Sequence, residues 1–521
     1  MSPSPSRPAA LSAHPPGLVV CFLTEMWERF SFYGMKALLF FYITKHHLFS
    51  DDEAYLLLGT YGGLAYALPV LGGLAADRWL GSRLAVILGG VLLCAGHFAM
   101  AWEGVPATLI DGVRQQDTGA LQVFYLALAL IITGVGLLKP NISTLVGALY
   151  AQDDPRRDAG FTWFYMGINL GAFAAALLCG WLGETWGWRW GFGLAGVGMA
   201  VGLVCFVGGR RHFGDLGLPP VPLTGVRRGL ALIVPLAVAL LVWPLMQAHL
   251  QVLDAVSLTA TEAVALLAAA ILLLWWGRFV LRHCDGPERA RMIRLMVLIA
   301  FSTVFWGLYE QSYGSWNAFV DRVVDRQALG VDWRASQLTA LGAFFIFLMA
   351  PLFARLWPAL AQRGCHPGDL RLFALALACA GLAMGVLALG ARWPLSDGRV
   401  SVWGLVLAYG VLTTGEMLLS PIGLSAVTRL SVPRVAGLMM GVWFLASAFG
   451  EMMAGRLGTL ASMPAGPPLD LASQRAHYAD VFTGFMALGL ISALVLWIIA
   501  LALGPRGRDA QPVTPSSMPG G

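Results

Sequence analysis

The sequence has few charged residues and almost no lysine. Of its 521 residues only 12% are Asp, Glu, Lys or Arg, whereas a soluble globular chain has about 25%. Lysine occurs only at positions 36, 45 and 139, and arginine supplies the other basic side chains. This composition excludes an ordinary soluble protein. It also makes a lysine inside an apolar run a candidate for function, because a lysine in apolar surroundings changes its protonation more readily than an arginine.

Cysteine pairs and catalytic motifs are absent from the sequence. The cysteines at 21, 94, 179, 205, 284, 365 and 379 form no CxxC pair, so we expect neither a disulfide framework nor a metal site. The chain has no HExxH, GxSxG or GxxxxGK[ST] motif, which argues against a membrane-embedded hydrolase and against ATP hydrolysis. We therefore expect no enzyme activity and no cofactor.

The two ends of the chain differ from the rest. Residues 1–16 are rich in Pro and Ser and lack a signal-peptide pattern, and residues 504–521 are polar. Segments of this kind cannot bury enough apolar surface to fold, so both are expected to be disordered.

Long hydrophobic runs make up most of the chain. Each of fourteen runs holds about twenty or more mostly apolar residues, enough to cross a hydrocarbon core of roughly 30 Å. We therefore predict an all-α polytopic membrane protein. The predicted spans are 17–44, 54–77, 83–102, 120–149, 158–182, 190–209, 228–248, 260–282, 290–320, 335–360, 369–391, 401–428, 435–455 and 479–503.

The distribution of Lys and Arg predicts the orientation. If the N-terminus is inside, cytoplasmic segments carry 21 basic residues and outer segments carry 10, and Arg29, Lys36 and Lys139 lie inside spans. Cytoplasmic loops of membrane proteins carry an excess of Lys and Arg. Both termini are therefore predicted to be cytoplasmic.

The first span carries charges on one helical face. At about 100° per residue, an arc of roughly 140° contains Glu25, Glu28, Arg29, Phe32, Tyr33 and Lys36. A charge near the membrane centre costs about 2.5–3.5 kcal/mol on insertion scales, so this face needs partners or water. A helix that extends its charges to the headgroups does not explain a stripe about 16 Å long.

Four further spans carry polar motifs. They are Gly136-Leu-Leu-Lys139-Pro-Asn-Ile-Ser143, Phe164-Tyr165-Met-Gly-Ile-Asn169-Leu-Gly171, Trp306-Gly-Leu-Tyr-Glu310-Gln311 and Gly415-Glu416-Met-Leu-Leu-Ser420-Pro-Ile-Gly423. Lys36 and Glu310 lie about 19 and 20 residues from the starts of their spans, and Lys139 and Glu416 differ in depth by about 6 Å. We predict two ion pairs, Lys36–Glu310 and Lys139–Glu416, each joining the two halves of the chain. Such a pair would close one side of a cavity and separate when that side opens.

The charges of this set do not balance. Four acids (Glu25, Glu28, Glu310, Glu416) face three bases (Arg29, Lys36, Lys139). One proton would neutralise the excess, which is our hypothesis for why the site takes a proton. Glu451 is left out because it lies near the outer end of its span and close to Arg456. The alternative is that these charges only fix helix packing, as buried polar residues in membrane bundles do.

The loop between the second and third spans, Gly73-Leu-Ala-Ala-Asp77-Arg78-Trp-Leu-Gly81-Ser-Arg83, resembles the GxxxDRxGxR motif of the major facilitator superfamily, with one extra residue after Arg78. The superfamily fold has two six-helix halves around a central cavity. This resemblance implies a division into 17–209 and 290–503, with two extra helices within 210–289.

Together the motifs resemble the proton-coupled oligopeptide transporter family in its bacterial fourteen-helix form. Glu25-xx-Glu28-Arg29-Phe30 matches the family's ExxER motif and Phe164 to Gly171 matches its FYxxINxG motif. The resemblance implies a multi-pass protein of the bacterial inner membrane that takes up di- and tripeptides with protons by alternating access. A monomer surrounded by lipid, without nucleic acid, is expected.

The resemblance also implies roles for single residues. Glu25, Glu28, Arg29 and Glu310 take part in proton coupling, and the gates are Lys36–Glu310 and Lys139–Glu416. Peptide contacts are implied for Tyr33, Lys36, Tyr66, Lys139, Asn169, Trp306, Glu416, Ser420 and Trp443. A zwitterionic peptide would place its carboxylate near the lysines and its amino group near Glu416.

The sequence departs from the family pattern at two places. Position 36 is Lys where many members have Arg, and Gly342-Ala343 stands where many members have Asn-Pro. Asn317 is an open candidate to supply the missing amide. Two alternatives remain: a proton-coupled symporter of another zwitterionic or anionic metabolite, and a relative that has lost transport.

Overall fold

The computed structural model describes residues 14–503 except 152, 155, 223, 248–251, 254–257, 364–366, 465–466 and 468. The disorder predicted for 1–16 and 504–521 therefore falls outside the described residues, apart from 14–16, and Cys365 is also outside them. Pro16 is already the first residue of a helix.

The described chain is built from long helices with short connections. The helical elements are α1 (Pro16–Phe41), η1 (Tyr42–His46), α2 (Asp51–Ala75), η2 (Ala76–Leu80), α3 (Ser82–Met100), α4 (Thr118–Ala148), α5 (Arg157–Trp186), α6 (Trp188–Gly209), η3 (Arg210–Phe213), α7 (Val226–Gln247), α8 (Ala260–His283), α9 (Gly286–Tyr309), η5 (Glu310–Ser312), α10 (Ser315–Val323), η6 (Ala335–Thr339), α11 (Ala340–Gln362), α12 (Asp369–Arg392), α13 (Val402–Leu430), η7 (Pro433–Val435), α14 (Ala436–Thr459) and α15 (Leu471–Leu503).

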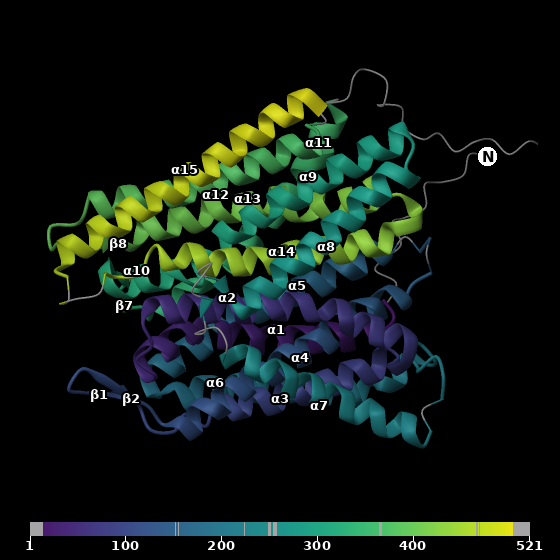
Figure 1. Ribbon diagram of the computed structural model, residues 1–521, viewed down its shortest axis with the longest axis horizontal. Coiled ribbons are helices and arrows are strands. Elements are labelled where there is room, and N and C mark those ends of the chain that lie inside the picture. The colour runs from purple at the N-terminus through teal and green to yellow at the C-terminus, as the bar shows by residue number, and fades with distance from the viewer. Residues whose placement is uncertain are drawn as a thin grey trace, which may run out of the picture.

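Short strand pairs lie only in the connections of the described chain. The antiparallel pairs are β1 (Thr108–Ile110) with β2 (Val113–Gln115), β3 (Val252–Leu253) with β4 (Leu258–Thr259), and β6 (Gln327–Ala328) with β7 (Val331–Asp332). The parallel pair is β5 (Val324–Asp325) with β8 (Val400–Ser401). The helices run lengthwise, and the pairs β1–β2, β5–β8 and β6–β7 fall at one end of the molecule, which we call the strand end (Figure 1).

Thirteen helical segments of the described chain are long and apolar enough to cross a membrane. The first helix, α1, is the fourteenth span: its 26 residues are long enough, but they include Glu25, Glu28, Arg29 and Lys36. The prediction of an all-α membrane protein with fourteen spans is confirmed. The main differences lie at the ends of two spans. The span predicted at 290–320 runs from Gly286 to Val323, and the last span begins at Leu471 rather than at residue 479.

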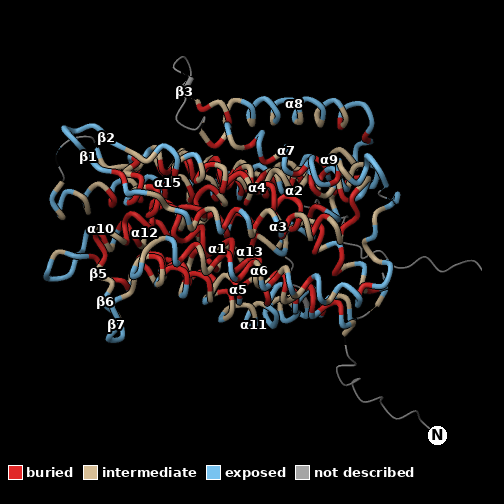
Figure 2. The backbone as a smooth tube through the Cα atoms, turned by 90° about the horizontal axis from the view of Figure 1, so that it is seen from below, coloured by how far each residue is buried: buried red, intermediate tan, exposed pale blue. Residues whose placement is uncertain are grey.

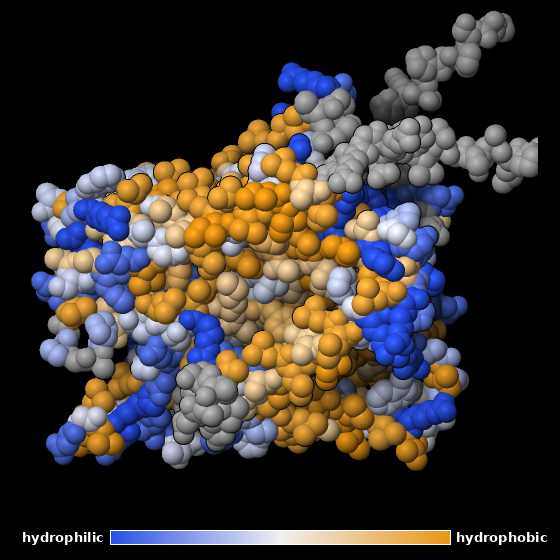
Figure 3. Space-filling model, turned by 45° about the horizontal axis from the view of Figure 1, so that its top comes forward, coloured by the Kyte–Doolittle hydropathy of each residue, from blue (hydrophilic) through white to orange (hydrophobic). Residues whose placement is uncertain are grey.

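The helices form two bundles. In Figure 1 the purple and blue helices of the first half lie below the green and yellow helices of the second half, and all run along the long axis. The bundles meet mainly where α2 packs on α14 and where α5 packs on η6 and α11. Apolar side chains cover the middle of the surface and hydrophilic ones the two ends (Figure 3), as a bilayer requires.

The two extra helices attach to different halves. Helix α7 packs on α4 of the first half, and Gln247 donates a 2.8 Å hydrogen bond to Gln122. Helix α8 is exposed along most of its length (Figure 2). Its Glu262 is ion-paired with Arg456 of α14, in the second half.

Glycine and proline determine how closely the helices that carry the site approach each other. Pro140 in α4 has no N–H, so the carbonyl of Gly136 loses its helical partner. That carbonyl lies against Gly72 of α2, where any Cβ would overlap it. The α2–α4 contact is therefore close, and it places Lys139 beside the aromatic residues of α2.

The span Gly286–Val323 is broken at Glu310, the charged residue of its motif. Helix α9 ends at Tyr309, η5 continues as a tight turn, and α10 begins after Gly314, whose φ and ψ are −106° and −102°. The break places Glu310 at a helix end, with its side chain directed toward α1.

Candidate functional site

Glu25, Glu28 and Arg29 form one buried cluster on α1. Arg29 Nη2 donates a 2.6 Å hydrogen bond to Glu28 Oε1, and Arg29 Nε lies 3.5 Å from Glu25 Oε1. All three side chains are buried, and Glu25 Oε2 has no hydrogen-bond partner among the described residues. Two carboxylates on one guanidinium leave this cluster with one negative charge in excess.

Lys36 lies one helical repeat further along the same face of α1. Its Nζ is 2.7 Å from Glu310 Oε2 and 2.6 Å from Glu451 Oε1, and 4.8 Å from the centre of the Tyr313 ring. The predicted Lys36–Glu310 pair is thus present and joins the two halves. Glu451 of α14 is a second partner, which the sequence prediction left out.

The reason for leaving out Glu451 was wrong. Arg456 does not pair with Glu451 but with Glu262 of α8. Five residues along a helix turn the direction by about 140°, so Glu451 and Arg456 point to different neighbours. Gly62 of α2 makes room for the acid, because a Cβ at that position would overlap the Glu451 carboxylate.

Lys139 of α4 has no carboxylate within ion-pair distance in the described part of the chain. Its Nζ lies 4.3 Å from the centre of the Tyr66 ring, a cation–π contact. It lines a cavity of about 240 Å³ together with Tyr66, Ser420, Trp443, Glu310 and Glu451. A half-buried cation without a counterion is suited to an anionic group of a ligand.

Glu416 of α13 lines an adjoining cavity of about 140 Å³. Its carboxylate interacts with the Tyr309 side chain, whereas Oε2 is buried and has no partner among the described residues. The same cavity is lined by Tyr33, Tyr66, Asn169, Trp306 and Glu310. Together the two cavities reach the range of about 300–1,000 Å³ that is typical of small-molecule sites.

The predicted Lys139–Glu416 ion pair is not formed in this structure. Lys139 contacts Tyr66 and Glu416 contacts Tyr309, and the two residues line different cavities. The cavities share Tyr66, Tyr165, Trp306 and Glu310 as wall residues, so the two charges face one continuous region from opposite halves. The physical reason is the separation of α4 from α13, since these helices do not pack on each other along their length.

Of the other predicted contact residues, Lys36 lines neither of these two cavities, whereas the rest lie on their walls. Tyr33, Tyr66, Asn169 and Trp306 line the cavity of Glu416, and Tyr66, Trp306, Ser420 and Trp443 line the cavity of Lys139. Trp443 packs on Gly423 of α13, where any Cβ would overlap the indole ring. The amide nitrogen of Asn169 donates to the carbonyl of Tyr165, in its own helix.

Gly342 leaves open space in the wall of the Glu416 cavity. A Cβ at this position would lie 3.9 Å from the Tyr309 hydroxyl and from the Tyr409 ring. Asn317 does not fill the gap: it is buried on α10, its amide donates to the carbonyl of Tyr313, and it lines neither cavity. Asn317 is therefore no substitute for the missing amide.

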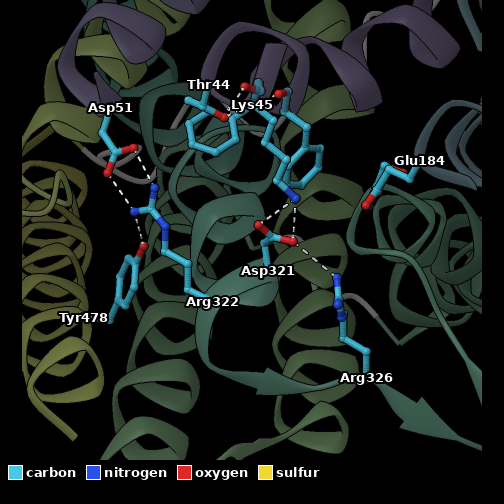
Figure 4. Close-up of polar contacts among 11 residues, drawn as sticks. Thr44, Lys45, Asp51, Glu184, Asp321, Arg322, Arg326 and Tyr478 are labelled. Atoms are coloured by element: carbon cyan, nitrogen blue, oxygen red, sulfur yellow. Dashed lines mark hydrogen bonds and ion pairs between the residues drawn. The ribbon is translucent and has the colours of Figure 1, made fainter. Parts of the chain in front are cut away.

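A second set of ion pairs joins the halves at the strand end (Figure 4). Arg322 of α10 donates two 2.7 Å hydrogen bonds to Asp51 of α2, and its Nη1 also lies 3.2 Å from the Tyr478 hydroxyl. Lys45 of η1 lies 2.8 Å from Asp321, which also accepts from Arg326. We call these residues the rim network.

Apart from the contacts of Lys36 with Glu310 and Glu451, the polar contacts between the halves within the described residues occur at one end. Besides the rim network, Glu184 accepts from the backbone of Ser336 and Gln337 donates to the carbonyl of Leu177. At the opposite end, no hydrogen bond or ion pair within the described residues joins the two halves; for example, Arg429 pairs with Asp369 inside the second half. The structure is thus held shut at the strand end.

We predict that Arg322→Ala lowers the free energy of unfolding by about 1.5–3 kcal/mol, the usual contribution of hydrogen bonds to charged groups. Thermal unfolding in detergent would measure it. The reversed pair, Asp51→Arg with Arg322→Asp, should recover a large part of the loss, because the ion pair is re-formed with opposite polarity. Losses that simply add in the double variant would contradict a direct interaction.

Comparison with known proteins finds one family. The profile of the POT family matches residues 83–468. The chain is 36% identical to the peptide transporter YePEPT of Yersinia enterocolitica over 85% of this chain and 88% of that protein. It is 32% identical to dipeptide and tripeptide permease A of Erwinia pyrifoliae over 98% of this chain and 100% of that protein.

Solved structures agree with these relatives. A peptide transporter POT in complex with sulfate is 33% identical, with a TM-score of 0.77 over 95% of this chain and 96% of that chain. A POT family transporter in complex with 5-aminolevulinic acid is 27% identical, with a TM-score of 0.78 over 95% and 98%.

Proposed function

Because the chain belongs to the POT family of transporters, we propose that this peptide transporter takes up di- and tripeptides together with protons by alternating access. The observation that carries the proposal is the charge arrangement of the central cavities. A cation from the first half, Lys139, and a carboxylate from the second half, Glu416, face the same region without counterions. A zwitterionic peptide supplies both missing charges.

The cavity walls support broad side-chain specificity. Tyr33, Tyr66, Trp306 and Trp443 offer flat amphipathic surfaces to varied side chains. Asn169 and Ser420 add hydrogen-bonding groups from opposite halves for the peptide backbone.

The proposed transport cycle is based on the difference between the two ends of the molecule in the contacts that join the halves. On the orientation predicted from the basic residues, the strand end faces outward, and the structure corresponds to a state closed to the outside. Opening outward separates Lys36 from the acids of the second half and breaks the rim network. In that state the opposite end closes, and Lys139 would meet Glu416, as the sequence prediction requires.

Proton coupling is proposed for the cluster of Glu25, Glu28 and Arg29. Its excess negative charge is buried, so a proton is its natural counterion. One elementary charge crossing 100 mV yields about 2.3 kcal/mol, enough for roughly fifty-fold accumulation.

The proposal is tested with purified protein in liposomes. Labelled dialanine should accumulate under an inside-negative potential, and a proton uncoupler should abolish the accumulation. If unlabelled 5-aminolevulinic acid or an anionic metabolite competes better than peptides, the protein is a symporter of another metabolite. No accumulation of any of these compounds would refute a transport function.

The role of Glu416 gives a specific prediction. Glu416→Ala should reduce uptake of free dialanine at least tenfold, because its amino group loses the carboxylate, and should affect N-acetylated dialanine less than twofold. Competition of uptake by both compounds measures the ratio. Thr414→Ala is the matched control on α13, since its hydroxyl bonds to the Gly410 carbonyl of its own helix. Equal losses for both peptides would contradict the role.

A further inference from the structure

The group around Lys36 contains one acid more than an ion pair needs. Lys36, Glu310 and Glu451 come from α1, η5 and α14, and their side chains are 4%, 8% and 5% exposed. Both acids contact the same ammonium group, at 2.7 and 2.6 Å. We call these three residues the Lys36 triad. Fully ionised, it carries one buried negative charge in excess.

No further cation of the described chain compensates this charge at contact distance. The groups around the triad are the tyrosines Tyr61 and Tyr66 of α2 and Tyr313 beside η5. Lys139 lines the neighbouring cavity but lies against Tyr66, and Arg456 is turned toward Glu262. An uncompensated buried charge is expensive, and carboxylates that share one site hold a proton between them.

Cavities reach the triad from both sides. On one side a cavity of about 20 Å³ is lined by all three residues and by Tyr55 and Gly455 of the α2–α14 contact. This volume holds one water molecule. On the other side Glu310 and Glu451 line the 240 Å³ cavity that contains Lys139. The two acids therefore separate a water-sized space from the substrate region.

The family resemblance already implies proton coupling for Glu310; we propose that Glu451 shares this role, so that the two acids together hold a second coupled proton, separate from the proton of the Glu25–Glu28–Arg29 cluster. A hydronium ion in the small cavity transfers its proton to a carboxylate oxygen, and water remains. Lys36 stays paired with whichever acid remains ionised, so the gate stays closed while the proton is bound. Release to water in the large cavity restores the charge.

The inference rests on the proposed function and goes beyond it, because it sets the number of protons that move with each peptide. The Glu25–Glu28–Arg29 cluster and the Lys36 triad each carry one negative charge in excess, and the opposite charges of Lys139 and Glu416 cancel. Two protons per peptide follow for the intact protein. Glu451→Gln leaves a neutral Lys36–Glu310 pair, so this variant should move one proton fewer.

The test measures protons per peptide in liposomes, from the dialanine gradient that stops net flux at a known proton gradient. The wild type should give two and Glu451→Gln one, with gradient-driven uptake relative to peptide counterflow reduced at least tenfold. Glu262→Gln is the matched control, since it removes an acid paired with α14 outside the triad, and should keep the wild-type ratio.

An unchanged proton number in Glu451→Gln overturns the inference and leaves the proposed function intact. A wild type that accumulates no peptide would instead refute the proposed function. If Glu451→Gln does not fold, Glu451→Asp keeps the carboxylate, must still move two protons, and must shift the pH midpoint of uptake because its contact with Lys36 lengthens. An unchanged midpoint in Glu451→Asp would likewise overturn the inference.

Discussion

Glu28→Gln is expected to cut the accumulation of peptide under a proton gradient about fifty-fold at 100 mV. Each coupled proton should contribute roughly this factor to the dialanine gradient, and the variant loses the proton of the Glu25–Glu28–Arg29 cluster while keeping that of the Lys36 triad. Glutamine keeps the shape of Glu28 and can still contact Arg29, but it cannot carry a proton. Arg29 retains Glu25 as an ionised partner. Liposome uptake with an imposed gradient provides the measurement.

Counterflow separates coupling from binding in this experiment. Exchange of labelled for unlabelled peptide needs no proton gradient, so it should persist in Glu28→Gln. Glu103→Gln is a suitable control, since Glu103 also accepts from an arginine, Arg189, but lies in a connection at the strand end. Undiminished accumulation in Glu28→Gln would remove Glu28 from the coupling mechanism.

Lys36→Met is expected to have the largest effect on stability. It leaves Glu310 and Glu451 buried and close together with no cation between them. Removing one partner of a buried ion pair costs about 3–5 kcal/mol. The variant should therefore unfold at a much lower temperature and should lose proton-driven uptake, as thermal unfolding in detergent and liposome assays would show.

The chain offers a matched control for this substitution. Lys45 pairs with Asp321, but its side chain is 42% exposed. Exposed ion pairs contribute about 0–1 kcal/mol, so Lys45→Met should change the unfolding temperature only slightly. Lys36→Arg keeps the positive charge and should retain part of the uptake. Similar effects of Lys36→Met and Lys45→Met would contradict the buried triad.

The sequence was sufficient for the fold and for part of the site. Apolar runs locate the spans because a helix needs about twenty apolar residues to cross the hydrocarbon core. Counting residues from the start of each span predicted the Lys36–Glu310 pair. This works because neighbouring helices of a bundle run nearly parallel and rise by the same distance per residue. The same comparison would have found Glu451, about 16 residues into its span and so at nearly the depth of Lys36.

Two features could not be read from depth. Whether Lys139 meets Glu416 depends on how far the halves are apart, which differs between states of one sequence. The rim network depends on which residues near the span ends meet across the two halves, and this is determined by the break in the span Gly286–Val323. Opposite charges that flank the spans, such as Asp51 and Arg322, are a signal only once the two halves are placed together.

The charged face of α1 has a consequence for how the protein is made. Four ionised groups on this helix cost on the order of 10 kcal/mol when it enters the bilayer alone. Glu25, Glu28 and Arg29 find partners within the helix, but Glu310 and Glu451, the partners of Lys36, are synthesised 274 and 415 residues later. Newly made α1 is thus poorly suited to stay in lipid by itself. The stable position of α1 in the membrane therefore depends on helices that are made later, so the C-terminal half of the chain stabilises the first helix.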